Sequence, residues 1–462
     1  MISLHNITFS RSGKKLFEDL SLEIKPGEHL IIRGSNGSGK TTLLELIAGV
    51  LHPQAGTVTY DFIEGDDWHE RYLQRQEKIR YIGAHALQTF LSGYHGLFYQ
   101  QRYYSIGDTQ IPKVSDFFGD HISRLQQYDF PENLNIQKLL GLELTRLSNG
   151  QLKKVLILHG LIKHMPRVLL LDYPLEGLDR ESRRDLTDFI DHIAGTFGIQ
   201  VIMTDHHHEL PQVINRRLVL DDFRIARIEA FEHRTEALPS DVKKAPAENN
   251  GQNKIPVVEM RSLTIQYGEK KIIENLSWSI HQGERWALTG KNGSGKTTLF
   301  SLIYADHPMA YSQQVFLFGK RRGTGESVWD IKKRINYLGP EQIHFLDSKS
   351  ITASCREYIL HQHAPGEDRL NTLIDFFNAA TLMNKPVRHL SSGELQVMLL
   401  LRFFMSDKEL LLLDEPFQFL DPVNKQRTTE YLNNYLDRNA TLVLITHYES
   451  DMIHWTQHRM RI

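Results

Sequence analysis

The same glycine-rich segment occurs twice in this chain, and this duplication restricts the possible folds more than any other feature. The segments are GSNGSGKT at 34–41 and GKNGSGKT at 290–297. Each is followed by an LS-x-G segment and then, at nearly the same distance, by an apolar run that ends in aspartate, at Asp172 and at Asp414. Several motifs repeated in the same order indicate a duplicated domain.

We therefore divide the 462 residues into a first domain over 1–235, a linker over 236–256 and a second domain over 257–462. The linker is rich in Pro, Asn and Lys and poor in apolar residues, which is typical of a solvated tether. Short apolar runs such as HLIIRG and VLLLDY predict strands buried on both faces, alternating with amphipathic helices. The predicted fold class is α/β: two tandem P-loop NTPase domains, each with a more helical insertion.

The pattern G-x-x-x-x-G-K-[ST] predicts a phosphate-binding loop in each copy. Its glycines let backbone N–H groups surround the phosphates, its lysine meets the β- and γ-phosphates, and its hydroxyl holds Mg²⁺. The predicted nucleotide-binding residues are Gly34, Asn36, Gly37, Ser38, Gly39, Lys40, Thr41 and Thr42 in the first copy and Gly290, Asn292, Gly293, Ser294, Gly295, Lys296, Thr297 and Thr298 in the second.

The two copies differ directly after their strand-end aspartates, where the second has Glu415 and the first has Tyr173. A carboxylate at this position can polarise an attacking water, whereas a phenol, with a reference pKa near ~10, is a poor base at neutral pH. We predict unequal sites, with Glu176 as an alternative base in the first copy. The predicted Mg²⁺ ligands are Thr41, Asp172, Thr297 and Asp414.

These motifs resemble those of the ATP-binding cassette (ABC) family over nearly the whole chain outside the linker. LSNGQ at 147–151 and LSSGE at 390–394 resemble the family's signature, EGLD at 176–179 and QFLD at 418–421 resemble its D-loops, and His447 resembles its switch histidine. The resemblance implies that the nucleotide is ATP and that the protein is an ATP hydrolase of the ABC type.

The switch position of the first copy is less distinct, because TDHHHE contains three consecutive histidines. Alignment of VIMTDH with LVLITH selects His206. A metal site formed by His206, His207 and His208 is the alternative, since imidazole is a common metal ligand.

The family resemblance also implies that two cassettes pack head to tail, so that each site combines one copy's glycine loop with the other copy's signature. We expect hydrolysis at the site that contains Glu415, and binding with slow or no turnover at the other. The first of these would join Lys296, Thr297, Asp414, Glu415 and His447 with Ser148, Gly150 and Gln151, and the second would join Lys40, Thr41, Asp172 and His206 with Ser391, Gly393 and Glu394.

Two features depart from the family pattern. The glutamine that commonly follows the middle strand is not clearly placed; the candidates are His85 or Gln88 in the first copy and Glu341 or Gln342 in the second. For the aromatic residue that stacks on adenine, Tyr267 is predicted in the second copy. The first copy offers Arg11 or Phe9, and packing of Phe9 in the core is the alternative.

Residues 306–339 resemble the corresponding segment of bacterial tandem ATPases associated with molybdate transport. Within this segment, KRRG at 320–323 is either an anion-binding turn or a solvated basic turn. In the first copy, the aromatic run at 89–105 lies where cassettes usually face a membrane partner, so it is either a docking surface or part of the packing of the helical insertion.

The composition restricts partners and compartment. With 54 basic and 56 acidic residues, no specific nucleic-acid partner and no direct membrane insertion are expected. A single cysteine, Cys355, fits a reducing compartment, and no apolar stretch is long enough to span a membrane. We expect a cytoplasmic protein that supplies energy to integral membrane transporter subunits. A soluble regulatory or ribosome-associated ATPase is the alternative, although the short linker, which contains Pro, argues against the long helical hairpin of that branch.

Overall fold

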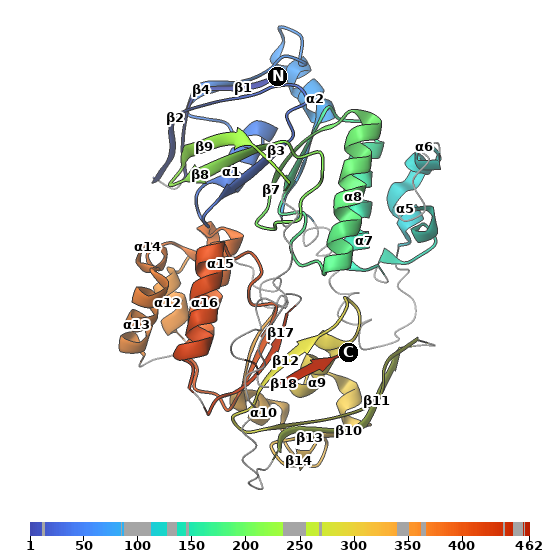
Figure 1. Ribbon diagram of the computed structural model, residues 1–462, viewed down its shortest axis with the longest axis vertical. Helices are drawn as coiled ribbons and strands as arrows, with labels where there is room; N and C mark the ends of the chain where they lie inside the picture. Colours follow the sequence, from blue (N-terminus) through green and yellow to red (C-terminus); the bar gives the residue numbers. More distant parts are fainter. Residues whose placement is uncertain are drawn as a thin grey trace. The chain divides into compact units, whose positions relative to one another are not determined.

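The chain forms two compact units, Met1–Glu236 and Ala237–Ile462. Each unit contains a mainly parallel sheet, an antiparallel sheet and helices packed on both (Figure 1), which confirms the α/β class. The computed structural model describes residues 1–11, 14–84, 86, 112–126, 136–144, 147–233, 256–267, 270–339, 351–361, 366–437, 439–446, 456 and 458–462.

The first unit begins with an antiparallel hairpin and continues with alternating strands and helices. In chain order its elements are β1 (Ile2–Arg11), β2 (Lys14–Ile24), β3 (Leu30–Gly34), α1 (Lys40–Ala48), β4 (Ala55–Tyr60), α2 (Trp68–Lys78), β5 (Ile79–Ile82), α5 (Val114–Phe118), η1 (Gly119–His121), α6 (Ile122–Gln126), η3 (Ile136–Leu139), α7 (Asn149–Ile162), β6 (Val168–Asp172), α8 (Arg180–Phe197), β7 (Gln200–Thr204), β8 (Arg216–Asp221) and β9 (Arg224–Ala230).

The main sheet of the first unit has the order β5-β6-β7-β3-β8-β9, and only β9 pairs antiparallel. Both faces of its central strands are covered, because successive side chains point to opposite faces. Leu30 and Ile32 of β3 pack in the core that contains α1, whereas Ile31 packs in the core that contains α7 and α8. These two long helices lie side by side (Figure 1).

The second unit repeats this plan with shorter helices around the phosphate loop. Its elements are β10 (Pro256–Tyr267), β11 (Lys270–His281), β12 (Arg285–Thr289), α9 (Lys296–Ile303), η5 (Pro308–Tyr311), β13 (Gln314–Leu317), β14 (Lys320–Arg321), α10 (Val328–Arg334), β15 (Ile335–Leu338), α12 (Cys355–Leu360), α13 (Glu367–Phe377), α14 (Ala380–Met383), η6 (Val387–His389), α15 (Ser392–Phe404), β16 (Leu410–Asp414), α16 (Pro422–Asn434), β17 (Thr441–Ile445) and β18 (His458–Arg461).

The strand order of its parallel sheet, β15-β16-β17-β12-β18, matches that of β5-β6-β7-β3-β8. Strand register brings the carboxyl ends of neighbouring strands together: Asp172 lies opposite Thr204, and Asp414 lies opposite Ile445. In an open α/β sheet this edge is where ligands bind. The glycine loops leave β3 and β12 at the same edge.

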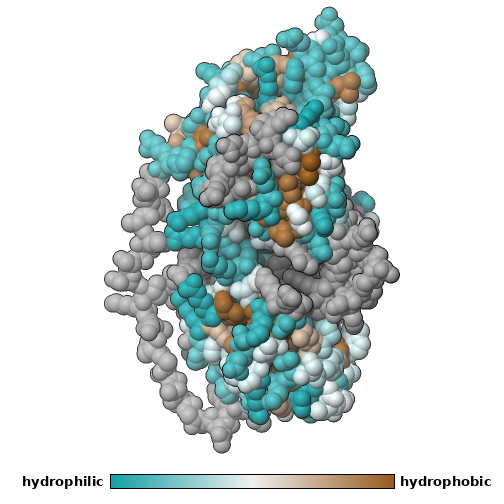
Figure 2. Space-filling model, turned by 90° about the vertical axis from the view of Figure 1, so that its right-hand side faces the viewer, coloured by the Kyte–Doolittle hydropathy of each residue, from teal (hydrophilic) through white to brown (hydrophobic). Residues whose placement is uncertain are grey.

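Figure 2 shows a mostly hydrophilic face with scattered apolar groups among the coloured residues. None of the helices in the described ranges is long and apolar enough to cross a membrane. Cys355 is fully buried in the helical part of the second unit, and burial raises the pKa of its thiol to about 12, so it packs as a small apolar residue.

Candidate nucleotide-binding sites

Each glycine loop folds around the ammonium group of its own lysine. Lys40 Nζ donates to the carbonyl oxygens of Gly34 at 2.9 Å and Ser35 at 2.6 Å. Lys296 Nζ makes the equivalent bonds to Gly290 and Lys291, both at 2.8 Å. Each lysine therefore lies inside the curve of its loop, where its charge and the backbone N–H groups would meet phosphate oxygens.

The first glycine of each loop is required by the close approach of another strand end. Gly34 and Gly290 have φ of 150° and 157°. A Cβ on Gly34 would collide with the carbonyl oxygen of Leu220, and one on Gly290 would lie 2.6 Å from that of Ile462. Further along the loops, Gly37, Gly39, Gly293 and Gly295 have positive φ of 76°, 98°, 78° and 103°. Only glycine adopts such conformations at little cost.

A hydroxyl and a carboxylate meet beside each loop. Thr41 Oγ1 donates to Asp172 Oδ2 at 2.9 Å, and Thr297 Oγ1 donates to Asp414 Oδ2 at 3.2 Å. Both aspartates are buried at the end of their strands. This pair of oxygen donors fits Mg²⁺, which takes one or two protein ligands and completes its shell with phosphate oxygens and water.

The strand ends that follow these aspartates have the same backbone conformation in both units. Tyr173 has φ of 50° and Glu415 has φ of 52°. The N–H of Tyr173 donates to the Thr204 carbonyl oxygen at 3.1 Å, and that of Glu415 donates to Ile445 at 2.9 Å. The left-handed conformation is uncommon for residues other than glycine. The two units thus share one scaffold and differ in the side chain that it presents.

In the first unit, the side chain of Tyr173 contacts the predicted switch residue. Its hydroxyl lies 3.2 Å from Nε2 of His206, and the two ring centroids are 5.2 Å apart. The ammonium nitrogen of Lys40 lies 5.9 Å from the centre of the tyrosine ring. The tyrosine and the histidine therefore lie near Lys40, the residue that is predicted to bind phosphate.

Asp205 and His207, the two residues that flank His206, have a structural role. Asp205 is fully buried and accepts bonds from the backbone N–H of Leu175 at 3.2 Å and of His207 at 2.9 Å, and it also pairs with the His207 ring. Burial opposes ionisation of Asp205, but His207 outweighs it and holds the pKa of that carboxyl well below its usual range. Burial likewise opposes the imidazolium, yet Asp205 raises the pKa of His207.

These contacts argue against the alternative of a metal site formed by His206, His207 and His208. His206 faces Tyr173, and the ring of His207 pairs with Asp205, so the two do not converge. Among the residues that the structure describes, no group of three or more His, Cys, Asp or Glu side chains is placed to hold a metal ion. The aspartate was not singled out by sequence, because its burial depends on β7 lying inside the sheet.

The signature segments begin the long helices α7 and α15. Ser148 Oγ accepts a bond from the N–H of Gln151 at 3.2 Å, and Gln151 Oε1 accepts one from the N–H of Ser148 at 2.9 Å. Ser391 and Glu394 form the same capping box in the second unit. This box satisfies backbone N–H groups that a helix start leaves unpaired. A Cβ on Gly150 would lie 3.1 Å from that of Ser182 on α8.

Sequence reasoning missed one residue on each signature helix. Lys153 Nζ donates to the carbonyl oxygens of Pro174 at 2.7 Å and Glu176 at 2.6 Å. In the second unit, Gln396 Nε2 donates to Pro416 at 2.7 Å. The helix is thus tied to the loop that follows the strand end. The one sequence feature that could have indicated this contact is that lysine and glutamine stand at matching positions, 153 and 396, of the two copies.

Several predicted residues fall outside what the structure describes. They are His447, the candidates His85, Gln88, Glu341 and Gln342, the run at 89–105 and most of the linker; for Tyr267 only the backbone of β10 is described.

Other predicted residues can be placed. Phe9 is 6% exposed and packs in the core of the first unit, as its alternative interpretation expected. The KRRG turn was expected either to bind an anion or to be solvated. Lys320 and Arg321 are exposed, but Arg322 is buried against the Tyr311 ring and donates to its hydroxyl at 3.2 Å. The solvated interpretation is therefore wrong for Arg322, because ring stacking draws its guanidinium inward.

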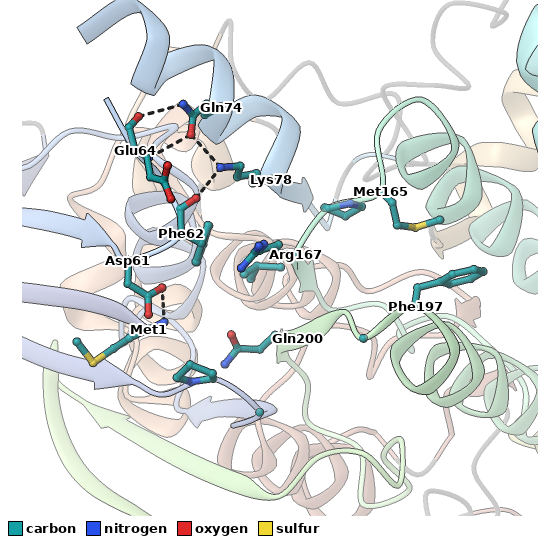
Figure 3. A pocket seen from close by; sticks show the side chains of 15 residues that line it. Met1, Asp61, Phe62, Glu64, Gln74, Lys78, Met165, Arg167, Phe197 and Gln200 are labelled. Atoms are coloured by element: carbon teal, nitrogen blue, oxygen red, sulfur yellow. Dashed lines mark hydrogen bonds and ion pairs between the residues drawn. The ribbon is translucent and has the colours of Figure 1, made fainter. Parts of the chain in front are cut away.

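A separate hollow of about 750 Å³ lies in the first unit, at the amino ends of β6 and β7 (Figure 3). Three of the charged groups in its lining bond to neighbouring groups. The N-terminal ammonium pairs with Asp61 at 2.6 Å, and Lys78 Nζ donates to the Phe62 carbonyl oxygen at 2.6 Å and to Gln74 at 2.8 Å. The phosphate loops leave the opposite edge of their sheets, so this hollow is not the nucleotide site.

Comparison with known proteins agrees with this geometry. The family model for the ABC transporter matches residues 17–176 and 273–418. The chain therefore belongs to the ABC transporter family and is an ABC-type ATPase with two cassettes.

Two relatives match over nearly their whole length. An uncharacterized ABC transporter ATP-binding protein of Schizosaccharomyces pombe is 29% identical, with 98% of this chain and 95% of that protein covered. The ABC transporter ATP-binding protein ModF of Escherichia coli is 27% identical, with the same coverage. In a model of ribosome-bound archaeal Pelota and ABCE1, a chain matches 99% of this one with a TM-score of 0.59 and 19% identity; 76% of that chain is covered, and the likeness shows the fold alone.

Proposed function

We propose that this protein binds ATP with Mg²⁺ at both phosphate loops and hydrolyses ATP mainly at the site that contains Glu415. The observation that carries this proposal is the pair of strand ends at Tyr173 and Glu415. They share one backbone conformation, with φ of 50° and 52°, so the carboxylate and the phenol are presented from equivalent positions. Only the carboxylate is a competent base at neutral pH.

The roles follow from the contacts at each loop. Lys40 and Lys296 would bind the β- and γ-phosphates, and the threonine–aspartate pairs would hold Mg²⁺, which neutralises charge on the phosphate oxygens. Glu415 would accept the proton of the attacking water. By family resemblance, His447 would contact the γ-phosphate, Tyr267 would stack on adenine, and each signature segment would complete the site of the other unit.

The assignment of the base is tested by two matched substitutions. Glu415→Gln removes the charge and keeps the volume, and we expect ATPase turnover to fall by at least about 100-fold while ATP binding persists. Glu176→Gln is the control, because the second unit has Gln418 at the matching position. Near-normal turnover of the Glu415→Gln variant, or an equal loss in Glu176→Gln, would overturn the assignment.

We further propose that hydrolysis energises a membrane transporter for an oxyanion such as molybdate. Membership of the ABC transporter family supports the transport role, and the resemblance of residues 306–339 to molybdate-associated ATPases, together with the ModF relative, supports the substrate class. The alternative is a ribosome-associated or regulatory ATPase, the kind of protein suggested by the fold likeness to ABCE1.

One fractionation experiment separates the two roles. The Glu415→Gln variant is expressed in the native cell at normal level, and lysates with and without ATP are separated into membranes, ribosomes and supernatant. ATP-dependent recovery with the membranes, lost in Glu415→Gln/Lys296→Ala, is the expected result. Recovery with ribosomes would support the alternative and contradict the transport proposal.

A further inference from the structure

Tyr173 and His206 are in contact at the strand ends of the first unit. Asp172 and Thr204 lie opposite each other at the ends of β6 and β7, so the tyrosine and the histidine leave adjacent strand ends. Their side chains meet at 3.2 Å between hydroxyl and Nε2. Tyr173 is 9% exposed, so this contact is mostly shielded from solvent.

The pair lies on the terminal-phosphate side of the site. Lys40, which meets the β- and γ-phosphates in loops of this type, has its ammonium nitrogen 5.9 Å from the tyrosine ring. Asp172 directly precedes Tyr173, and its Oδ2 accepts a bond from Thr41 Oγ1 of α1 at 2.9 Å; these two residues are the predicted Mg²⁺ ligands. A group that distinguishes ATP from ADP must contact this region.

The loop that carries Tyr173 is tied down on both sides. Lys153 donates to the Pro174 carbonyl oxygen at 2.7 Å, and the Leu175 N–H donates to Asp205 at 3.2 Å. The N–H of Tyr173 is bonded to Thr204. These bonds fix the backbone from which the tyrosine ring reaches His206.

We propose that Tyr173 engages His206 and thereby makes the first site bind ATP and ADP with nearly equal affinity. A neutral imidazole has one donor and one acceptor nitrogen, so a nitrogen bonded to the phenol is not available to a γ-phosphate. The first site then holds ATP or ADP equally well, so its occupancy does not depend on whether the nucleotide has been hydrolysed. This inference rests on the proposal that the first loop binds nucleotide.

A double-mutant cycle in the full chain tests the inference. The Lys296→Ala background removes nucleotide binding at the second loop, and calorimetry measures the Kd of MgATP and MgADP for four chains: the parent, Tyr173→Phe, His206→Ala and the double variant. We expect the ratio of the ADP Kd to the ATP Kd to stay within about threefold in the parent. It should rise about tenfold in Tyr173→Phe, because His206 is released to the γ-phosphate.

The remaining variants separate this role from a structural one. His206→Ala alone should leave the ratio unchanged, and the double variant should return it to the parent value. An ATP preference above tenfold in the parent, or a ratio in Tyr173→Phe equal to that of the parent, would overturn the inference. If the background chain binds neither nucleotide, the proposed function of the first loop fails, and the inference fails with it.

Discussion

Lys153 and Gln396 occupy the same position on the two signature helices, and each donates to the proline carbonyl that follows the strand end, at 2.7 Å in both units. Only the lysine reaches a second carbonyl, that of Glu176 at 2.6 Å. The first unit therefore has a partly buried charge where the second has a buried neutral amide. This difference leads to a prediction about pH.

We expect Lys153→Gln to change how stability depends on pH. Burial lowers the pKa of Lys153 from 10.5 to about 8, although Glu176 and Asp205 act in the opposite direction. Between these two values the unfolded chain binds a proton that the folded chain has released, so the free energy of unfolding rises with pH. The gain is at most about 3 kcal/mol.

Hydrogen exchange of the α7 amides at pH 7 and 9.5 measures this effect. The protection of the parent, relative to Lys153→Gln at the same pH, should increase from the lower to the higher pH. Gln396→Met, which removes a neutral donor, serves as the control and should show no such trend. If α7 protection changes with pH equally in the parent and in Lys153→Gln, the lowered pKa assigned to Lys153 is wrong.

The pair of Asp205 and His207 should stabilise the first unit most between about pH 4 and 6.5. The pKa of Asp205 is lowered, so its contribution is lost as pH falls through the folded-state value. The pKa of His207 is raised, so its contribution is lost as pH rises through the folded-state value. Asp205→Asn should cost about 1–3 kcal/mol at pH 6 and less at pH 8.5, as measured by urea unfolding. His208→Gln, on an exposed neighbour, should have no effect at either pH.

Two glycine-to-alanine changes should have opposite effects on thermal stability. Gly34→Ala should destabilise the first unit by about 2 kcal/mol or more, because the added methyl group collides with the Leu220 carbonyl. Gly195→Ala lies inside α8 with nothing within 4 Å of the new Cβ. It should stabilise by roughly 0.5–1 kcal/mol through helix propensity. Scanning calorimetry of both variants checks the signs.

Thr297→Val should weaken the use of Mg²⁺ during hydrolysis. The substitution keeps the side-chain shape but removes the hydroxyl that lies 3.2 Å from Asp414. We expect the Mg²⁺ concentration for half-maximal ATPase activity to rise about tenfold, equivalent to the loss of one charge-assisted contact. Thr429→Val removes a hydroxyl that bonds only within α16, to the Lys425 carbonyl oxygen at 3.0 Å, and should leave this concentration unchanged.

The fold was predictable because its signals are local and repeated. The glycine loops, the apolar strands ending at Asp172 and Asp414, and the matching order of motifs all indicate two α/β cassettes, and the structure and the family match confirm that class. The contact between Tyr173 and His206, and the one between Lys153 and Glu176, join segments that are far apart in the chain. Such pairs depend on strand register and helix placement, which residue patterns do not specify.

The left-handed backbone conformation at Tyr173 also determines what a substitution at this position would do. The strain of a positive φ, roughly 1–2 kcal/mol for a residue with a side chain, persists in the first unit although the carboxylate found at Glu415 is missing there. The backbone at Tyr173 thus has the conformation that presents Glu415 in the second unit, with a phenol in place of the carboxylate. The single replacement Tyr173→Glu would put a carboxylate on a backbone that already has this conformation, so the difference between the two strand ends lies in one side chain.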